Sequence, residues 1–229
     1  MKMTRAIIVM AALAALLTPP GARIGPGFTA TTGAAISIVG VAHAAETRSP
    51  EELIDELHET LLAVMKKADE LGYSGRYDML YPVISGTFDL DFMGTKSLGR
   101  HWRELDPEQQ KDWIKAFGNF TISNYAARFD GYSGQTFEVV GEEAASHETR
   151  VVRTKIVDPE RDEEETQLNY RLRETDGGWR VIDVYLHGSV SELALRRAEF
   201  STAYERQGFD KVLASLKSKI EDLSSGPGA

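Results

Sequence analysis

The spacing of hydrophobic residues changes once along this 229-residue chain, near Gly134. Before that point, apolar side chains recur every three or four positions, as they do on one face of an amphipathic helix. After it, they alternate with polar side chains over four stretches, as in strands with one buried face. Helices followed by sequential strands predict an antiparallel sheet packed on helices, and therefore an α+β fold.

Capping signals mark the expected helix boundaries. Ser49 precedes Pro50, and two acidic residues follow, which is typical of a helix N-terminus. This first helix is expected to stop at Gly72. The longest helix follows Asp106, carries an aromatic stripe and ends near Gly131. The other expected helices are Tyr73–Ser85, interrupted at Tyr81-Pro82; Asp89–Leu98; a helix from Ser189 or Ser191 to about Gln207; and Phe209–Leu223.

Four strands are expected in the second half, separated by short turns. In the middle two, apolar residues alternate with basic ones, so one face is predicted to be buried and the other exposed. In the last strand, simple alternation places Val181 on the same face as Asp183, with Val184 opposite and both faces substantially covered. The expected strands are Thr136–Glu143, Glu148–Val157, Thr166–Glu174 and Gly178–Leu186.

The N-terminal segment is typical of a secretory signal, because Met1–Leu17 combines two basic residues with an apolar run. Ala42-His43-Ala44 supplies a small-x-small cleavage site. We therefore expect a signal peptide over residues 1–44, a single exported domain over 45–223 and a disordered tail over 224–229. An internal start, or an uncleaved second apolar run over 34–45, is an alternative, although a spanning helix needs about 20 residues.

Composition excludes several classes of function. The formal net charge is −9. The charged residues of the expected signal are all basic, so its loss would make the net charge more negative. Adsorption to nucleic acid is therefore disfavoured. The chain has no cysteine, which excludes disulfides, thiol catalysis and cysteine-ligated metals. The histidines show no metal-ligand spacing. We expect no metal, no cofactor and no nucleic-acid partner.

Asp183 is the strongest candidate for an enzymatic group. It lies in mid-strand, where an unpaired carboxylate is costly. With Tyr170 or Tyr185 as a phenol, it could serve as the general base of an NTF2-like enzyme of the ketosteroid-isomerase type. The competing interpretation is that Asp183 accepts hydrogen bonds and fixes the sheet or the following turn. Because no second acid or base accompanies it, no catalytic residue is expected.

Two segments carry the most informative motifs of the chain. The first, Leu80–Trp102, holds a turn at Pro82, then Phe88-Asp89, Phe92-Met93 and Leu98-Gly99-Arg100-His101-Trp102; the long helix follows with Pro107-Glu108-Gln109-Gln110, Phe117 and Phe120. The second holds Trp179-Arg180-Val181-Ile182-Asp183-Val184, Gly188-Ser189-Val190-Ser191, Phe200 and Gly208-Phe209-Asp210. In their order, these motifs resemble the MlaC/toluene-tolerance family of periplasmic lipid carriers. Ser191–Phe200 is more similar to the hopanoid-associated, HpnM-like branch, and His187 stands where an acidic residue is common.

The resemblance implies a curved antiparallel sheet of four or slightly more strands, wrapped by helices in an NTF2-like arrangement around a deep apolar cavity. Acyl chains would enter this cavity and leave the head group near the mouth. The sequence itself does not distinguish such a cavity from a filled core, because the same residue types build both. The expected lipid-contacting residues are Phe88, Phe92, Met93, Leu98, Trp102, Phe117, Phe120, Tyr125, Val139, Val152, Ile156, Leu168, Tyr170, Leu172, Val184 and Tyr185.

The implied function is that of a soluble, monomeric periplasmic protein of an Mla-type pathway that supports outer-membrane asymmetry. It would carry a phospholipid or hopanoid between inner- and outer-membrane complexes without catalysis. Arg196 and Arg197, expected on the exposed face of their helix, are candidates for docking to those complexes. A structural or interaction module of the envelope that binds no lipid is a further alternative.

Overall fold

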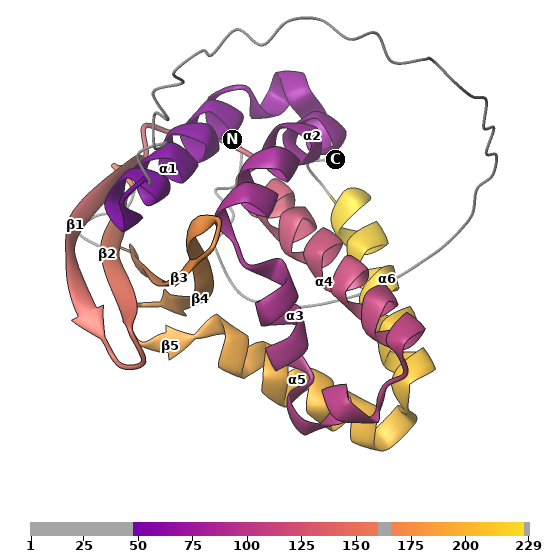
Figure 1. Cartoon of the computed structure of the whole chain (residues 1–229). Helices are drawn as coiled ribbons and strands as arrows, with labels where there is room; N and C mark the ends of the chain where they lie inside the picture. Colours follow the sequence, from indigo (N-terminus) through magenta and orange to yellow (C-terminus); the bar gives the residue numbers. More distant parts are fainter. Residues whose placement is uncertain (1–47, 160–165, 227–229) are drawn as a thin grey trace, which may run out of the picture.

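The computed structural model describes residues 48–159 and 166–226, and the structural statements below concern these ranges. The expected signal peptide, 1–44, and the last three residues of the expected tail lie outside them. Seven helices and a five-stranded sheet make up the described part of the chain, which confirms the α+β class (Figure 1). The helices are α1 (Pro50–Lys66), α2 (Ala68–Thr87), α3 (Leu90–Ser97), the 3₁₀-helix η1 (Gly99–Glu104), α4 (Pro107–Arg128), α5 (Glu192–Gln207) and α6 (Phe209–Ser224).

The two helices with the strongest capping signals, at Ser49 and Asp106, begin where the sequence predicts. The Ser49 hydroxyl accepts a hydrogen bond from the Glu52 amide at 3.2 Å, while the Glu52 carboxylate accepts one from the Ser49 amide at 2.7 Å. Asp106 and Gln109 form the same reciprocal pair at the start of α4. Each pair satisfies amides that the helix itself leaves without acceptors. These two reciprocal pairs of hydrogen bonds, called capping boxes, fix where α1 and α4 begin.

Two helix boundaries differ from the prediction. α1 ends at Lys66 rather than at Gly72, and Gly72 instead forms a kink inside α2 with φ 59°. The predicted interruption at Tyr81-Pro82 is wrong, because α2 continues through Pro82 to Thr87. Proline removes one helical hydrogen bond, here to the carbonyl of Asp78. Both residues are exposed, so water can replace the lost donor.

The sheet is an antiparallel meander in which each strand pairs with the next, in the order β1-β2-β3-β4-β5. The four predicted strands are confirmed within two residues at each end. β5 was not predicted, because two residues are too few to show alternation. The strands are β1 (Thr136–Ala145), β2 (Thr149–Val157), β3 (Thr166–Thr175), β4 (Gly178–Leu186) and β5 (Val190–Ser191).

A bulge in β4 changes which of its residues face the helices. Tyr170 of β3 pairs with Val184, but Leu172 pairs with Val181, so the register shifts by one residue between them. Val181 and Val184 therefore lie on the same face, and the expectation from simple alternation is wrong for Val181. An extra residue in one strand reverses the alternation beyond it. Both valines are buried against the helices as a result.

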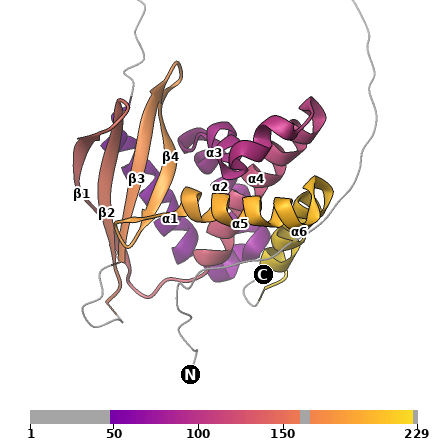
Figure 2. The ribbon, with the colours of Figure 1, turned by 90° about the horizontal axis from the view of Figure 1, so that it is seen from below.

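The helices gather on one side of the sheet (Figure 2). α1 packs on β1, β2 and β4, and α4 packs on α6 farther from the sheet. The apolar face of the two middle strands is buried against the helices, as predicted, whereas Arg153 of the opposite face is exposed. In the described part of the chain, no helix combines the length and apolar character needed to cross a bilayer.

Candidate functional site

A small pocket lies where α3, α4, β4 and the start of α5 meet. Its volume is about 30 Å³, which is room for about two water molecules. The pocket is much smaller than the deep cavity implied by the resemblance. It is lined by Phe88, Met93, Phe117, Phe120, Thr121, Asn124, Tyr125, Arg128, Val184, Glu192, Leu193 and Arg196.

The pocket lining is divided into an apolar and a polar end. Phe88, Met93 and Val184 are buried between α2, α3 and the sheet. At the other end, Arg128 and Glu192 reach the surface, with side chains 26% and 20% exposed. A pocket with this lining suits a molecule with an apolar body and a polar end.

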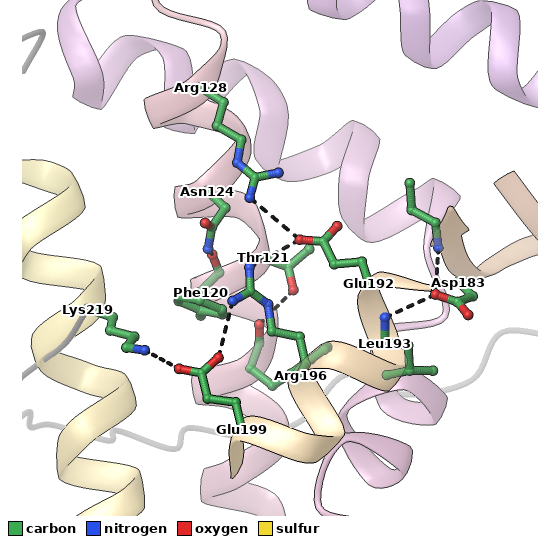
Figure 3. A network of polar contacts seen from close by, with 12 residues as sticks. Phe120, Thr121, Asn124, Arg128, Asp183, Glu192, Leu193, Arg196, Glu199 and Lys219 are labelled. Carbon is green, nitrogen blue, oxygen red and sulfur yellow. Dashed lines mark hydrogen bonds and ion pairs between the residues drawn. The ribbon is translucent and has the colours of Figure 1, made fainter. Parts of the chain in front are cut away.

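Three charged side chains converge at the polar end (Figure 3). One Glu192 carboxylate oxygen, Oε1, lies 3.1 Å from Nη2 of Arg196 and 3.7 Å from Nη2 of Arg128. The two guanidinium groups come from different helices, α5 and α4, so Glu192 joins these helices across the pocket mouth. Arg196 also lies over the Phe120 ring, 5.0 Å from its centroid.

The charged cluster continues away from the pocket. Glu199 lies 3.4 Å from Arg196 and also forms an ion pair with Lys219 of α6 (Figure 3). Arg196 is only 6% exposed, so the expectation that it faces solvent is wrong, whereas Arg197 is exposed as expected. Successive helical residues are about 100° apart, so only one of two neighbours can face the core. Here the buried one is Arg196, which is stabilised by two carboxylates.

Asp183 is a structural acceptor and does not line the pocket. Its carboxylate accepts hydrogen bonds from the Ser191 hydroxyl at 2.6 Å, the Leu193 amide at 3.0 Å and the Val184 amide at 2.8 Å. Ser191 in turn caps α5 through the Ala194 amide. Burial raises the pKa of Asp183, while these hydrogen bonds oppose the rise. The carboxylate thus ties the start of α5 to β4, which matches the structural interpretation rather than the catalytic one.

The two tyrosines considered as catalytic partners lie elsewhere. The Tyr170 hydroxyl lies 3.2 Å from Nε2 of buried His58 on α1. Tyr185 pairs with Asn169, and its hydroxyl lies 3.5 Å from Arg171. Neither phenol is a hydrogen-bond partner of Asp183, whose carboxylate is bonded to Ser191, Leu193 and Val184. Within the described ranges, no group of three His, Asp or Glu residues is placed to bind a metal.

Asp89 of the Phe-Asp motif connects α3 to the sheet. Its Oδ1 accepts a hydrogen bond from the Phe92 amide, which caps α3, and its Oδ2 accepts from Nη2 of Arg173 at 2.6 Å. The Asp89 amide donates to the Val181 carbonyl at 2.8 Å. Arg173 also lies 4.5 Å above the Phe92 ring centroid. This arrangement fixes the neighbouring residue, Phe88, at the apolar end of the pocket.

Six of the sixteen residues predicted to contact lipid line this pocket: Phe88, Met93, Phe117, Phe120, Tyr125 and Val184. Six others belong to the buried core around it: Leu98, Val152, Ile156, Leu168, Tyr170 and Leu172. The remaining four, Phe92, Trp102, Val139 and Tyr185, are partly exposed.

The polar lining was not predicted. Arg128, Thr121 and Asn124 give no signal of their own in the sequence of α4. Glu192 and Arg196 are spaced four residues apart, which is the separation of ion pairs on one helix face. That spacing could have identified the pair, although not its position at a pocket.

Comparison with known proteins was consistent with this architecture. The model of the family described as "MlaC protein" matches residues 55–218. A solved structure of a phospholipid-binding protein from Ralstonia solanacearum, in complex with a phospholipid, matches with a TM-score of 0.64 and 21% sequence identity. The match covers 75% of this chain and 97% of that chain. At this level of identity, the structural match supports a shared fold.

Proposed function

The chain belongs to the MlaC family, and on that premise we propose that it is a periplasmic phospholipid-binding protein. The observation that carries the proposal is the divided pocket, with buried aromatic side chains at one end and arginines at the other. A phospholipid has the same division between acyl chains and head group. The Ralstonia solanacearum protein of the same fold was solved with a phospholipid.

Binding of acyl chains requires the pocket to enlarge. Ligand pockets typically measure about 300–1,000 Å³, whereas this one measures about 30 Å³. Burial of acyl chains is favourable by about 0.8 kcal/mol per CH₂, which can offset the separation of packed side chains. We expect the Glu192 and Leu193 side chains to move, because both line the polar end and are partly exposed.

The same proposal extends to transport. We propose that the protein is exported by its N-terminal segment and transfers its lipid, as a monomer, between inner- and outer-membrane complexes. It would act without catalysis or nucleic-acid binding. Arg197 remains a candidate docking residue, since it is exposed on α5. A hopanoid is the alternative cargo, suggested by the sequence of Ser191–Phe200.

Native mass spectrometry of the protein from residue 45, purified without detergent from an envelope fraction, tests the proposal. We expect additional mass that dissociates on denaturation and is identified as phospholipid by extraction. The mature protein incubated with phospholipid vesicles after delipidation should regain that mass. A Tyr81→Ala variant, altered at an exposed position outside the pocket lining, serves as a control for general loss of apolar surface.

The possible outcomes separate the functional classes. Extracted hopanoid would keep the carrier function and change its cargo. A protein without bound lipid, which also takes none from vesicles, would overturn lipid binding and favour an interaction module of the envelope.

A further inference from the structure

We propose that Arg128 and Arg196 form a binding site for the phosphate of the lipid head group, and that the Glu192 carboxylate occupies this site when no lipid is bound. The inference rests on the proposed function and assigns its head-group site. It is carried by the position of these three side chains at the polar end of a pocket whose other end is apolar.

The geometry at Glu192 is that of an anion held between two arginines. Both Nη2 atoms approach the same oxygen, Oε1, at 3.1 and 3.7 Å. Guanidinium groups bind phosphate oxygens with the same planar donors that bind carboxylates. A phosphate at the position of the Glu192 carboxylate would therefore meet donors that are already converged on one point.

Burial makes Arg196 a firm element of the site. It is 6% exposed, and its guanidinium is held in place by Glu199 and by the Phe120 ring. A buried, positioned cation loses little conformational freedom when it binds an anion. Arg128 is more exposed and belongs to another helix, so it can adjust to a larger group.

The contacts of Glu192 indicate exchange rather than addition. Its Oε1 already lies 3.1 Å from Nη2 of Arg196 and 3.7 Å from Nη2 of Arg128, so a phosphate can reach both donors only where the carboxylate now lies. A phosphate beside that carboxylate would bring two anions together in a partly buried position, which is unfavourable. Displacement of Glu192 by a phosphodiester leaves one anion between the two arginines. Glu192 is the first residue of α5 and its side chain is 20% exposed, so it can turn toward water.

Two polar side chains of α4 complete the mouth. The Asn124 amide donates to the Phe120 carbonyl at 2.8 Å, and the Thr121 hydroxyl donates to the Phe117 carbonyl at 2.9 Å. The Asn124 nitrogen carries a second N–H, and both side chains line the pocket. They can contact a head group beside the phosphate, while Phe117 and Phe120 lead toward the apolar end.

The test compares four variants of the mature protein by isothermal titration calorimetry: Glu192→Gln, Arg128→Gln, Arg196→Lys and Arg197→Gln. The titrants are dihexanoyl phosphatidylglycerol, dihexanoylglycerol and inorganic phosphate. Arg196→Lys retains the buried charge and avoids unfolding, and Arg197→Gln is a matched control, since its side chain lies outside the pocket lining.

We expect Glu192→Gln to bind dihexanoyl phosphatidylglycerol about tenfold more tightly, and Arg128→Gln and Arg196→Lys about tenfold less tightly, because charged hydrogen bonds are gained or lost. Dihexanoylglycerol affinity should stay unchanged in all variants, as should both affinities in Arg197→Gln.

Each other outcome overturns a defined part of the argument. If a substitution changed the affinities for both lipids equally, the proposed phosphate site would be wrong, although lipid binding itself would stand. Inorganic phosphate bound as tightly as the phospholipid would identify a site for a free anion instead of a head group. Absence of binding of either lipid to the unaltered protein would overturn the proposed function itself.

Discussion

Nε2 of His58 and the hydroxyl oxygen of Tyr170 lie 3.2 Å apart, in the buried contact between α1 and β3. The sequence separates them by 112 residues. The Phe137 ring covers the imidazole at 4.6 Å between centroids, and within the described residues Nδ1 of His58 has no hydrogen-bond partner. Because protonation would place a charge in this apolar contact, burial lowers the pKa of His58 to about 4.

The low pKa of His58 predicts loss of stability in acid. The ordinary value is 6.5, so between pH 6.5 and 4 the unfolded chain binds more protons than the folded protein. The free energy of unfolding therefore falls as the pH falls through this window, by about 2 kcal/mol at pH 5 from His58 alone. Urea unfolding of the unaltered protein and of His58→Gln at pH 7.5 and pH 5 measures this contribution.

His58→Gln should lose about 2 kcal/mol less than the unaltered protein between these two pH values. Other titrating groups are common to both proteins, so they cancel in the difference. Identical pH dependence in the two proteins would show that His58 protonates in the folded protein without cost.

Periodicity predicted the helices and strands because packing follows it closely here. Val152, Tyr170 and Leu172 are buried as their alternation indicated. The failures occur where one residue changes the geometry of its neighbours. The β4 bulge reverses the face of Val181, and a solvent-facing Pro82 does not interrupt α2.

The site was predictable only in its apolar half. Phe88, Phe117 and Phe120 could be assigned to the interior, because aromatic residues at helical spacing are usually buried. Arg128 and Glu192 could not be paired, since their contact depends on how α4 and α5 cross. The pattern also placed Arg196 at the surface, because burial of an arginine depends on carboxylates that only the tertiary structure brings near.

Asp183 should be required for the attachment of α5 to the sheet. Asp183→Ala leaves two amides and a hydroxyl without their acceptor, so we expect the free energy of unfolding to fall by about 3 kcal/mol. Asp183→Asn keeps one acceptor oxygen, and a loss of about 1 kcal/mol is expected. Asp112→Ala, at an exposed position of α4, serves as the control and should change stability by less than about 0.5 kcal/mol. Urea unfolding that gave Asp183→Ala the same stability as the control would rule out the anchoring role.

Two glycines of similar local structure should respond oppositely to alanine. A Cβ at Gly94 in α3 would lie 2.7 Å from Cδ1 of Ile114, whereas at Gly86 in α2 nothing lies within 4 Å. Gly94→Ala forces the end of the Ile114 side chain to move, and we expect a loss of about 1 kcal/mol. Gly86→Ala restricts the unfolded chain without a clash and should stabilise the protein by about 0.5–1 kcal/mol. Thermal unfolding of both variants measures the difference, and an increase in the midpoint for Gly94→Ala would contradict the close packing of these helices.

Asp89 combines a helix cap with an ion pair, and two substitutions can separate these roles. Asp89→Asn retains an acceptor for the Phe92 amide but loses the charge that Arg173 binds. It should cost up to about 1 kcal/mol, since the Arg173 side chain is 40% exposed. Asp89→Ala also removes the cap, which adds about 1 kcal/mol. Urea unfolding should therefore rank Asp89→Ala below Asp89→Asn. Raising the salt concentration to 1 M should narrow the stability gap between the unaltered protein and each variant by the same amount and leave the gap between the two variants unchanged, because salt screens the ion pair but not the cap. If the two variants were equally stable, the Asp89 side chain would act through Arg173 alone.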